Sequence, residues 1–480
     1  MKILRLIVLM VSIMMLVVAC GNQAAPVSPA AEATAAPAPT EAGAPAPTEA
    51  GAPAEAVTPA TDSNGGDKIT LTYWMGGEPG TVDARTQLID EYMKEHPNVE
   101  VKTTFMGSEL VSPSILPALN AGTGPDIFGA GTGPGQPAAI INAGHALDLT
   151  PFYYEFGWNK VIPPTVVNYT SSNGKLWAVG DSVETTMMFY NKDIFEKNGL
   201  SVPTSWGEFL AVCDKLKAAK YETVIALGGA DKWPISHWQS MLWGAYAGPK
   251  GIDKVMFSDG RWDDQQFVQA TKTLEQLNEA GYFGPNSLAV KYDDVMPKFW
   301  RGEIPMTFTG SWVIGDAVRD LGDKIATFSV FPVPSPVEGS PIYPTEDIGS
   351  GWYINAKSPH TREAAELLNF LFFRDESRKM LLESGDDVPV GPLELDNVNL
   401  PKLQQELFAI NNKNRGNGTI HAFLDTVQPA NMTDVTYDGL QAILAKQMTP
   451  EQFTQQLQSS WEEAKGEDAI LKPGGVAPQQ

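Results

Sequence analysis

The amino-acid sequence predicts an α/β protein of two lobes, built on largely parallel sheets that helices cover. Its 480 residues are too many for one sheet and enough for two cores. A strand, helix, strand pattern opens the folded part, and helices with clear start and stop signals follow it. The formal net charge of -23 argues against nucleic acid or an anionic membrane surface as a partner. Neutral or cationic ligands are therefore expected.

The first 66 residues are typical of an exported and tethered chain. Residues 1–20 combine a basic start, a short apolar run and a small-residue cleavage site, as in a secretory signal peptide. The ending "VVAC" resembles the lipobox of bacterial lipoproteins, which implies that Cys20 is lipidated; the alternative is an ordinary signal peptide with a chance cysteine. Residues 21–66 repeat "APAPTEAG" and carry almost no large apolar side chain, which predicts a disordered tether.

The folded body begins near Lys68 with a predicted βαβ unit. "ITLTYW" alternates apolar residues with threonine, which is the period of a strand. "TVDARTQLIDEYMKEHP" places four large apolar residues on one helical face and stops before Pro97. "VEVKTTF" then returns to alternation. Because two strands joined by a helix run parallel, this unit predicts a largely parallel sheet.

Three later regions are predicted to be helical. Ser205 and Glu208 form a candidate capping box, and the helix that follows carries Cys213 on its apolar stripe. This pattern indicates a buried structural thiol rather than a nucleophile. "TREAAELLNFLFF" predicts a helix that ends at Gly385, and the chain after about Pro401 is mostly helical in pattern.

Few residue patterns indicate catalytic chemistry, a cofactor or a metal. The five histidines are scattered, and no pair has metal-ligand spacing. "GTGPDIFGAGTGPGQ" lacks the ending of a phosphate loop and the spacing of a dinucleotide site. No nucleophile elbow is present, but Glu and Asp are plentiful, so paired carboxylates for glycoside hydrolysis stay open.

Tryptophan recurs at the ends of predicted elements, often beside glycine. An indole ring can stack on the C–H face of a sugar while nearby carboxylates and amides bind the hydroxyls. Each of these residues could equally be core packing. The residues placed in this way are Trp74, Trp177, Trp233, Trp238, Trp312 and Trp352.

Four motifs in fixed order resemble the extracellular solute-binding proteins of ABC importers, in particular the sugar-binding, maltose-binding-protein-like group. They are "AGTGPDIF", "GKLWAVGDSVETTMMFYNKDIFEKNGLSVPTSWGEF", "RGEIPMTFTGSW" and "GWYINAKSPHTREAAELLNFL". The resemblance covers about residues 68–460 and implies a two-lobed periplasmic-binding-protein-like fold with discontinuous lobes. It assigns 67–183 and 350–395 to lobe 1, and 184–349 and 396–480 to lobe 2. Hinge crossings are expected near 181–186, 345–351 and 390–400.

The resemblance also nominates residues for the cleft between the lobes. Glu184 matches a glutamate that reaches sugar hydroxyls, and Trp312 matches an aromatic residue that stacks on sugar. The full set of substrate-binding candidates is Glu78, Glu184, Asp231, Trp238, Trp312 and Trp352. Two departures put maltose itself in doubt, because "GAGTGPGQPAA" and "QPANMTDVTYDG" lack the acidic or aromatic contacts of many relatives.

The function that the resemblance implies is a non-catalytic receptor. It would bind a sugar or oligosaccharide between the lobes and deliver it to ABC permease subunits. The protein is expected to be a monomer without cofactor or metal, outside the cytoplasm and attached to the bacterial membrane only by its lipid. The alternatives are a receptor for a polyamine, a glycerol phosphate or a peptide, and a secreted carbohydrate-active enzyme.

Overall fold

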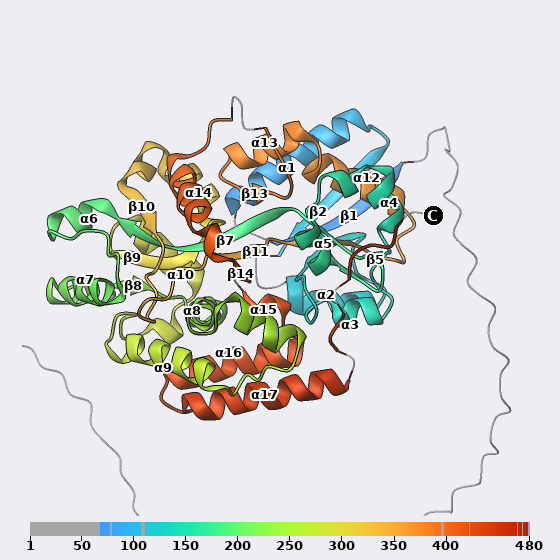
Figure 1. Cartoon of the computed structure of the whole chain (residues 1–480). Helices are drawn as coiled ribbons and strands as arrows, with labels where there is room; N and C mark the ends of the chain where they lie inside the picture. The colour runs from blue at the N-terminus through green and yellow to red at the C-terminus, as the bar shows by residue number, and fades with distance from the viewer. Residues whose placement is uncertain are drawn as a thin grey trace, which may run out of the picture. The chain divides into compact units, whose positions relative to one another are not determined.

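A computed structural model of the protein describes residues 68–76, 79–106, 111–394, 398–421, 423–467, 469–472 and 474–478 (Figure 1). These residues all belong to one compact unit, 65–480. The predicted signal peptide, Cys20, the predicted tether and Glu78 lie outside the described residues.

The first lobe consists of a mixed sheet and its covering helices. Among the described residues the strand order of this sheet is β2-β1-β3-β12-β6. β1 runs parallel to β2 and β3, and β12 runs antiparallel to β3 and β6. The strands are β1 (Ile69–Met75), β2 (Val99–Phe105), β3 (Ile127–Ala130), β6 (Val179–Gly180) and β12 (Gly351–Ile354). Its helices are α1 (Pro79–Glu95), α2 (Val111–Asn120), α3 (Ala138–Asn142), α4 (Thr150–Glu155), α5 (Pro164–Thr170), α12 (Thr361–Phe372) and α13 (Asp375–Glu383), with η1 (Trp158–Lys160) and the hairpin of β4 (Ser171–Ser172) and β5 (Lys175–Leu176).

The second lobe is built around the long strand β7 (Ser182–Asn191), which pairs antiparallel with β9, β10, β11 and β13. The other strands are β8 (Ile225–Ala226), β9 (Met306–Gly310), β10 (Phe328–Phe331), β11 (Thr345–Ile348), β13 (Val388–Pro389) and β14 (Ile420–His421). Its helices are α6 (Lys192–Lys197), α7 (Trp206–Ala218), α8 (Trp233–Phe257), α9 (Gln265–Glu279), α10 (Tyr292–Trp300), α11 (Val313–Leu321), α14 (Lys402–Asn414), α15 (Leu424–Val427), α16 (Ala430–Leu444) and α17 (Pro450–Gly466), with η2 (Ser287–Ala289), η3 (Gly322–Thr327) and η4 (Arg415–Asn417).

Two short segments carry the chain from one sheet to the other. Asp181 alone separates β6 of the first sheet from β7 of the second. Gly349 and Ser350 separate β11 from β12. A third passage follows α13, where β13 pairs with the beginning of β7. The start of β7, which runs across the middle of Figure 1, is therefore the meeting point of all three passages.

The local predictions hold for the first βαβ unit and fail in two other places. The strands and the helix within 69–105 form as expected, and the strands pair in parallel. The helix predicted to continue to Gly385 is instead two helices, α12 and α13, which are interrupted at Phe373 and Arg374. The prediction of largely parallel sheets is wrong for the second sheet. β7 enters it from the other lobe and runs against most of its neighbours.

The C-terminal tail returns from the second lobe to the first. After α17 the amide of Leu471 donates to the carbonyl of Pro134 at 2.6 Å. The amide of Ala477 donates to the carbonyl of Gly174 at 2.8 Å, and the Tyr154 hydroxyl donates to the Ala477 carbonyl at 2.7 Å. The tail thus contacts the first lobe, whereas the sequence analysis assigned all of 396–480 to the second.

Candidate functional site

The turn that follows β9 sets Trp312 at the end of a buried strand. Every residue of β9 is buried, and the chain then turns through Ser311. The Ser311 amide donates to the Thr185 carbonyl at 2.8 Å, and the Thr185 amide donates to Ser311 Oγ at 3.0 Å. The indole of Trp312 lies over Gly310, where a Cβ would overlap the ring. Gly310 is therefore required by the position of Trp312, which stays partly exposed.

Trp312 belongs to a group of five rings from four segments of the chain, here called the aromatic group: Trp233, His237, Tyr292, Trp312 and Phe423. The Trp312 ring centroid lies 6.0 Å from that of Trp233, 5.6 Å from that of His237 and 5.5 Å from that of Phe423. Trp312 Nε1 donates to the Tyr292 hydroxyl at 3.2 Å. Trp233 is also partly exposed. The group therefore offers ring surface with a fixed orientation.

His237 adds no charge to the aromatic group at neutral pH. Its ring stacks on Phe423 at 4.2 Å between centroids, and its Nδ1 is buried without a hydrogen bond to any described residue. Burial lowers the pKa of His237 to about 3, because a buried imidazolium loses its hydration. The ring is therefore neutral and acts as an additional flat surface.

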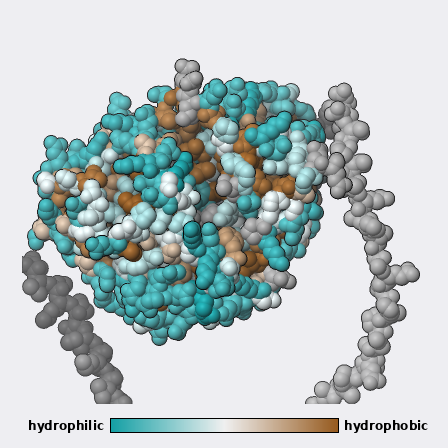
Figure 2. Space-filling model, viewed as in Figure 1, coloured by the Kyte–Doolittle hydropathy of each residue, from teal (hydrophilic) through white to brown (hydrophobic). Residues whose placement is uncertain are grey.

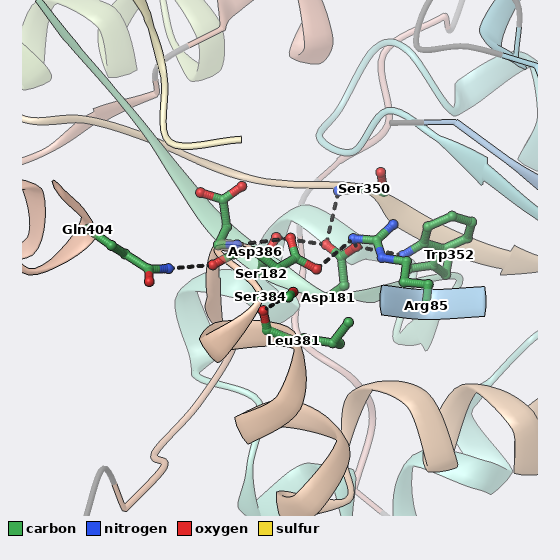
Figure 3. Close-up of polar contacts among 10 residues, drawn as sticks. Arg85, Asp181, Ser182, Ser350, Trp352, Leu381, Ser384, Asp386 and Gln404 are labelled. Atoms are coloured by element: carbon green, nitrogen blue, oxygen red, sulfur yellow. Dashed lines mark hydrogen bonds and ion pairs between the residues drawn. The ribbon is translucent and has the colours of Figure 1, made fainter. Parts of the chain in front are cut away.

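A cluster of charged side chains lies where the three passages meet (Figure 3). Arg85 of α1 donates from its Nη2 to Asp181 Oδ2 at 2.8 Å and to Asp386 Oδ2 at 3.4 Å. All three residues are buried. Burial lowers the pKa of Arg85, but Asp386 and Asp181 outweigh it, so the pKa lies above its ordinary value. The guanidinium therefore joins the first and third passages while it remains charged.

Glu184 lies beside this cluster and next to the Ser311 turn, and it is partly exposed. A Cβ at Gly349 would lie 2.4 Å from Ser182 Oγ, 2.9 Å from Asp181 Oδ1 and 3.0 Å from Glu184 Oε1, so a larger residue there would displace these side chains. Burial of the carboxyl and the charge of Asp387 raise the pKa of Glu184 well above its ordinary value. Glu184 and the aromatic group thus lie on either side of Ser311.

Two of the predicted binding residues are core residues in the structure. Trp352 is fully buried, stacks on Phe372 at 5.7 Å and donates from Nε1 to Asp181 Oδ2 at 2.8 Å. Because Phe372 belongs to α12, the Trp352 ring packs between its sheet and a covering helix. Trp238 is also fully buried, with its ring 4.6 Å from that of Phe308. Trp238 lies on a buried face of α8, so it packs the second core.

The other four predicted residues have different outcomes. Trp312 and Glu184 are the chain neighbours of Ser311 and Thr185, which are joined by two hydrogen bonds. Asp231 is partly exposed near the aromatic group, and its carboxylate accepts a hydrogen bond from the Tyr292 amide at 2.6 Å. Asp231 therefore positions the first residue of α10. The role of Glu78 stays a prediction, because this residue lies outside the described ones.

Several residues that lie at this site were not predicted from the sequence. His237, Tyr292 and Phe423 complete the aromatic group, and Asp387 lies buried beside Ser311. "WPISHW" contains a signal for His237, since His237 lies one helical turn after Trp233 on α8. No local pattern marks Phe423 or Asp387, because only tertiary pairing brings them to the site.

Two further properties concern the described part of the chain alone. None of its helices combines the length and the apolar composition needed to cross a membrane. It also contains no group of three acidic, histidine or cysteine side chains placed to hold a metal ion.

Figure 2 shows a mainly hydrophilic face with hydrophobic residues gathered near its middle.

Comparisons with known proteins identify the family. Residues 78–376 match the model of the bacterial extracellular solute-binding protein family. An uncharacterised ABC transporter extracellular-binding protein of Pyrococcus horikoshii is 25% identical over 310 residues, 62% of this chain and 66% of that protein. The multiple sugar-binding protein of Streptococcus mutans is 24% identical over 335 residues, 68% of this chain and 76% of that protein.

A solved structure confirms the fold class. A chitin oligosaccharide binding protein superimposes with a TM-score of 0.75 at 23% sequence identity, covering 84% of this chain and all of that one. The resemblance seen in the sequence and the two-lobed α/β fold are thus both confirmed. This chain belongs to the bacterial extracellular solute-binding protein family.

Proposed function

We propose that this protein is the extracytoplasmic solute receptor of an ABC importer and that it binds a sugar or oligosaccharide between its two lobes. The observation that carries the proposal is the partly exposed Trp312 indole, held over Gly310 at the end of β9 and beside Glu184. A ring surface next to a carboxylate suits a sugar, which has apolar C–H faces and hydroxyl rims. The named function of the Streptococcus mutans relative supports the same solute class.

The proposed mechanism is closure of the lobes around the solute. In this proposal lobe 1 comprises 67–183 and 350–395, apart from the ends that pair in the second sheet as β13 and the start of β7. Lobe 2 comprises 184–349 and 396–480, apart from the tail that contacts lobe 1. A solute that contacts both lobes favours the closed form by its differential affinity for that form. The permease subunits then recognise the closed, loaded receptor. Single residues such as Asp181 that link the sheets are suited to act as hinges.

The proposal includes attachment to the membrane through Cys20 alone. Residues 1–20 would be removed as a lipoprotein signal peptide, and residues 21–66 would tether the folded body to the lipid. The protein would act as a monomer and catalyse no reaction. The buried acids Asp181 and Asp386 are already engaged with Arg85, which supports a structural role for them rather than that of a hydrolytic pair.

A thermal-shift screen of the purified protein tests this function. We expect a monosaccharide or oligosaccharide to raise the melting temperature, since a ligand at 100 times its Kd adds about 2.7 kcal/mol to the free energy of unfolding. Chromatography of each sugar after incubation should show it unchanged. A shift with a polyamine, glycerol phosphate or peptide but with no sugar would contradict the proposal. Sugar hydrolysis would establish the enzyme alternative instead.

A further inference from the structure

Three carboxylates lie in a row across the strands at the start of β7. The register of β11 places Asp347 opposite Glu184. β13 places Val388 opposite Val183, so Asp387 comes opposite Glu184 on the other side. Side chains at opposite positions of antiparallel strands share one face of the sheet, and like charges there repel. Glu184 is therefore the centre of a row of three acids.

The two outer acids have their own hydrogen-bond donors. Asp347 Oδ2 accepts from Thr426 Oγ1 at 2.6 Å, and Ser311 donates to the Asp387 carboxylate. Asp387 is only 3% exposed, yet its Oδ1 has no hydrogen-bond partner among the described residues. No described side chain or amide donates to Glu184 either. The centre of the row thus has unused acceptors that face a partly exposed position.

The basic groups near the site are engaged elsewhere. Arg85 is bonded to Asp181 and Asp386. Lys232, beside the aromatic group, pairs with Asp438. Arg319 of α11 pairs with Asp316 and Asp320. The charge of Arg85 also acts on Asp387 and Glu184, but this single guanidinium faces five carboxylates: Asp181, Glu184, Asp347, Asp386 and Asp387. The remaining negative charge favours a cationic solute group over a neutral or anionic one.

The aromatic group adjoins this row through Ser311, which bonds to Asp387 and precedes Trp312. A cation held by carboxylates beside ring faces gains a second attraction from the ring quadrupoles. We propose that Glu184 and Asp387 bind a positively charged amino group of the solute, so that the preferred ligand is an amino sugar rather than a neutral or phosphorylated sugar. This inference rests on the proposed function and specifies its solute class.

Calorimetric titration of the purified protein at pH 7.5 with matched disaccharides tests the proposal. The β-1,4-linked disaccharide of glucosamine and cellobiose differ only in carrying an amine or a hydroxyl at C2. We expect the amine form to bind at least tenfold more tightly than cellobiose and than the N-acetylated form. Equal or tighter binding of cellobiose would overturn the amine subsite and leave the sugar receptor standing. Binding of spermidine with no sugar bound would overturn the sugar receptor and leave the subsite. If neither the sugars nor spermidine bind, both the sugar receptor and the amine subsite are overturned.

The variant Glu184→Gln separates ligand binding from a structural role. The amide is nearly isosteric with the carboxylate but carries no charge. We expect the ratio of the affinities for the glucosamine disaccharide and for cellobiose to fall to about one. The melting temperature should rise because repulsion within the row decreases. Glu346→Gln is the control, because Glu346 is the next residue to Asp347 in β11 and pairs with Arg415. If Glu184→Gln changes only the melting temperature and leaves the ratio intact, the row has a structural role alone.

Discussion

Replacement of Arg85 by Met should separate the electrostatic contribution of Arg85 to stability from the contribution of its packing. The guanidinium of Arg85 lies 5.4 Å from the ring centroid of Trp352 and 5.6 Å from that of Phe372. Methionine keeps much of this apolar contact. It removes both ion pairs, at 2.8 Å to Asp181 and 3.4 Å to Asp386. Two buried carboxylates then remain without the cation that joins them.

The expected loss at pH 7.5 is about 3–5 kcal/mol of unfolding free energy, the cost of removing one partner from a buried ion pair. Burial already raises the pKa of Asp386, and Arg85 opposes that rise. Without Arg85 the folded-state pKa of Asp386 rises further above its unfolded value. Such a group destabilises the fold as pH rises through the folded pKa, and has no effect below the unfolded pKa. The loss should therefore shrink at pH 4.5.

Urea unfolding followed by tryptophan fluorescence at pH 4.5 and 7.5 measures both effects. Arg378→Met is the matched control. Arg378 is equally buried, but it donates to the carbonyls of Val390, Gly391 and Pro392. Its acidic partner Asp375 is exposed, so the substitution leaves no buried acid unpaired. The loss of unfolding free energy in Arg378→Met should therefore be the same at pH 4.5 and pH 7.5. An equal loss at both pH values for Arg85→Met would refute the electrostatic reasoning.

Three further outcomes are expected. Trp312→Ala should weaken sugar binding at least tenfold, about 1.4 kcal/mol, with little loss of stability. The control Trp461→Ala should lower the unfolding free energy by about 3–5 kcal/mol and leave the affinity unchanged. The reverse pattern in calorimetry and urea unfolding would show that Trp312 is a core residue. Burial raises the pKa of the Cys213 thiol, so a maleimide should label it only after urea unfolds the protein, and fast labelling of the folded protein would contradict its buried position. Thr449 caps α17 with a complete capping box, so Thr449→Ala should lower the unfolding free energy by about 1 kcal/mol; no change in urea unfolding would show that this cap contributes nothing.

The sequence predicted those features that local patterns determine. Period-two alternation located β1, and the motif around Glu184 located the strand that leaves the first lobe. It could not separate Trp312 from Trp352, because each follows a glycine and serine turn. Their difference comes from the neighbouring strands and helices, which enclose Trp352 completely and leave Trp312 partly exposed. The difference in exposure between Trp312 and Trp352 can therefore be predicted only once the tertiary structure is known.

The row of acids shows the same limit. Asp347, Glu184 and Asp387 are far apart in the sequence, and only the pairing of β11 and β13 with β7 aligns them. The register of such pairings depends on the whole fold rather than on any one segment. Like charges at opposite positions disfavour this register, so no propensity rule would have proposed it.

Fluorine NMR of the protein labelled with 5-fluorotryptophan tests most directly whether the solute contacts Trp312. The Trp312 resonance is assigned by its loss in Trp312→Phe, and the resonance of Trp461 serves as an internal control. With the sugar that gives the largest thermal shift, the account predicts that the Trp312 resonance moves with the same saturation curve as calorimetry while that of Trp461 stays in place. An unchanged Trp312 resonance at full saturation would contradict the account.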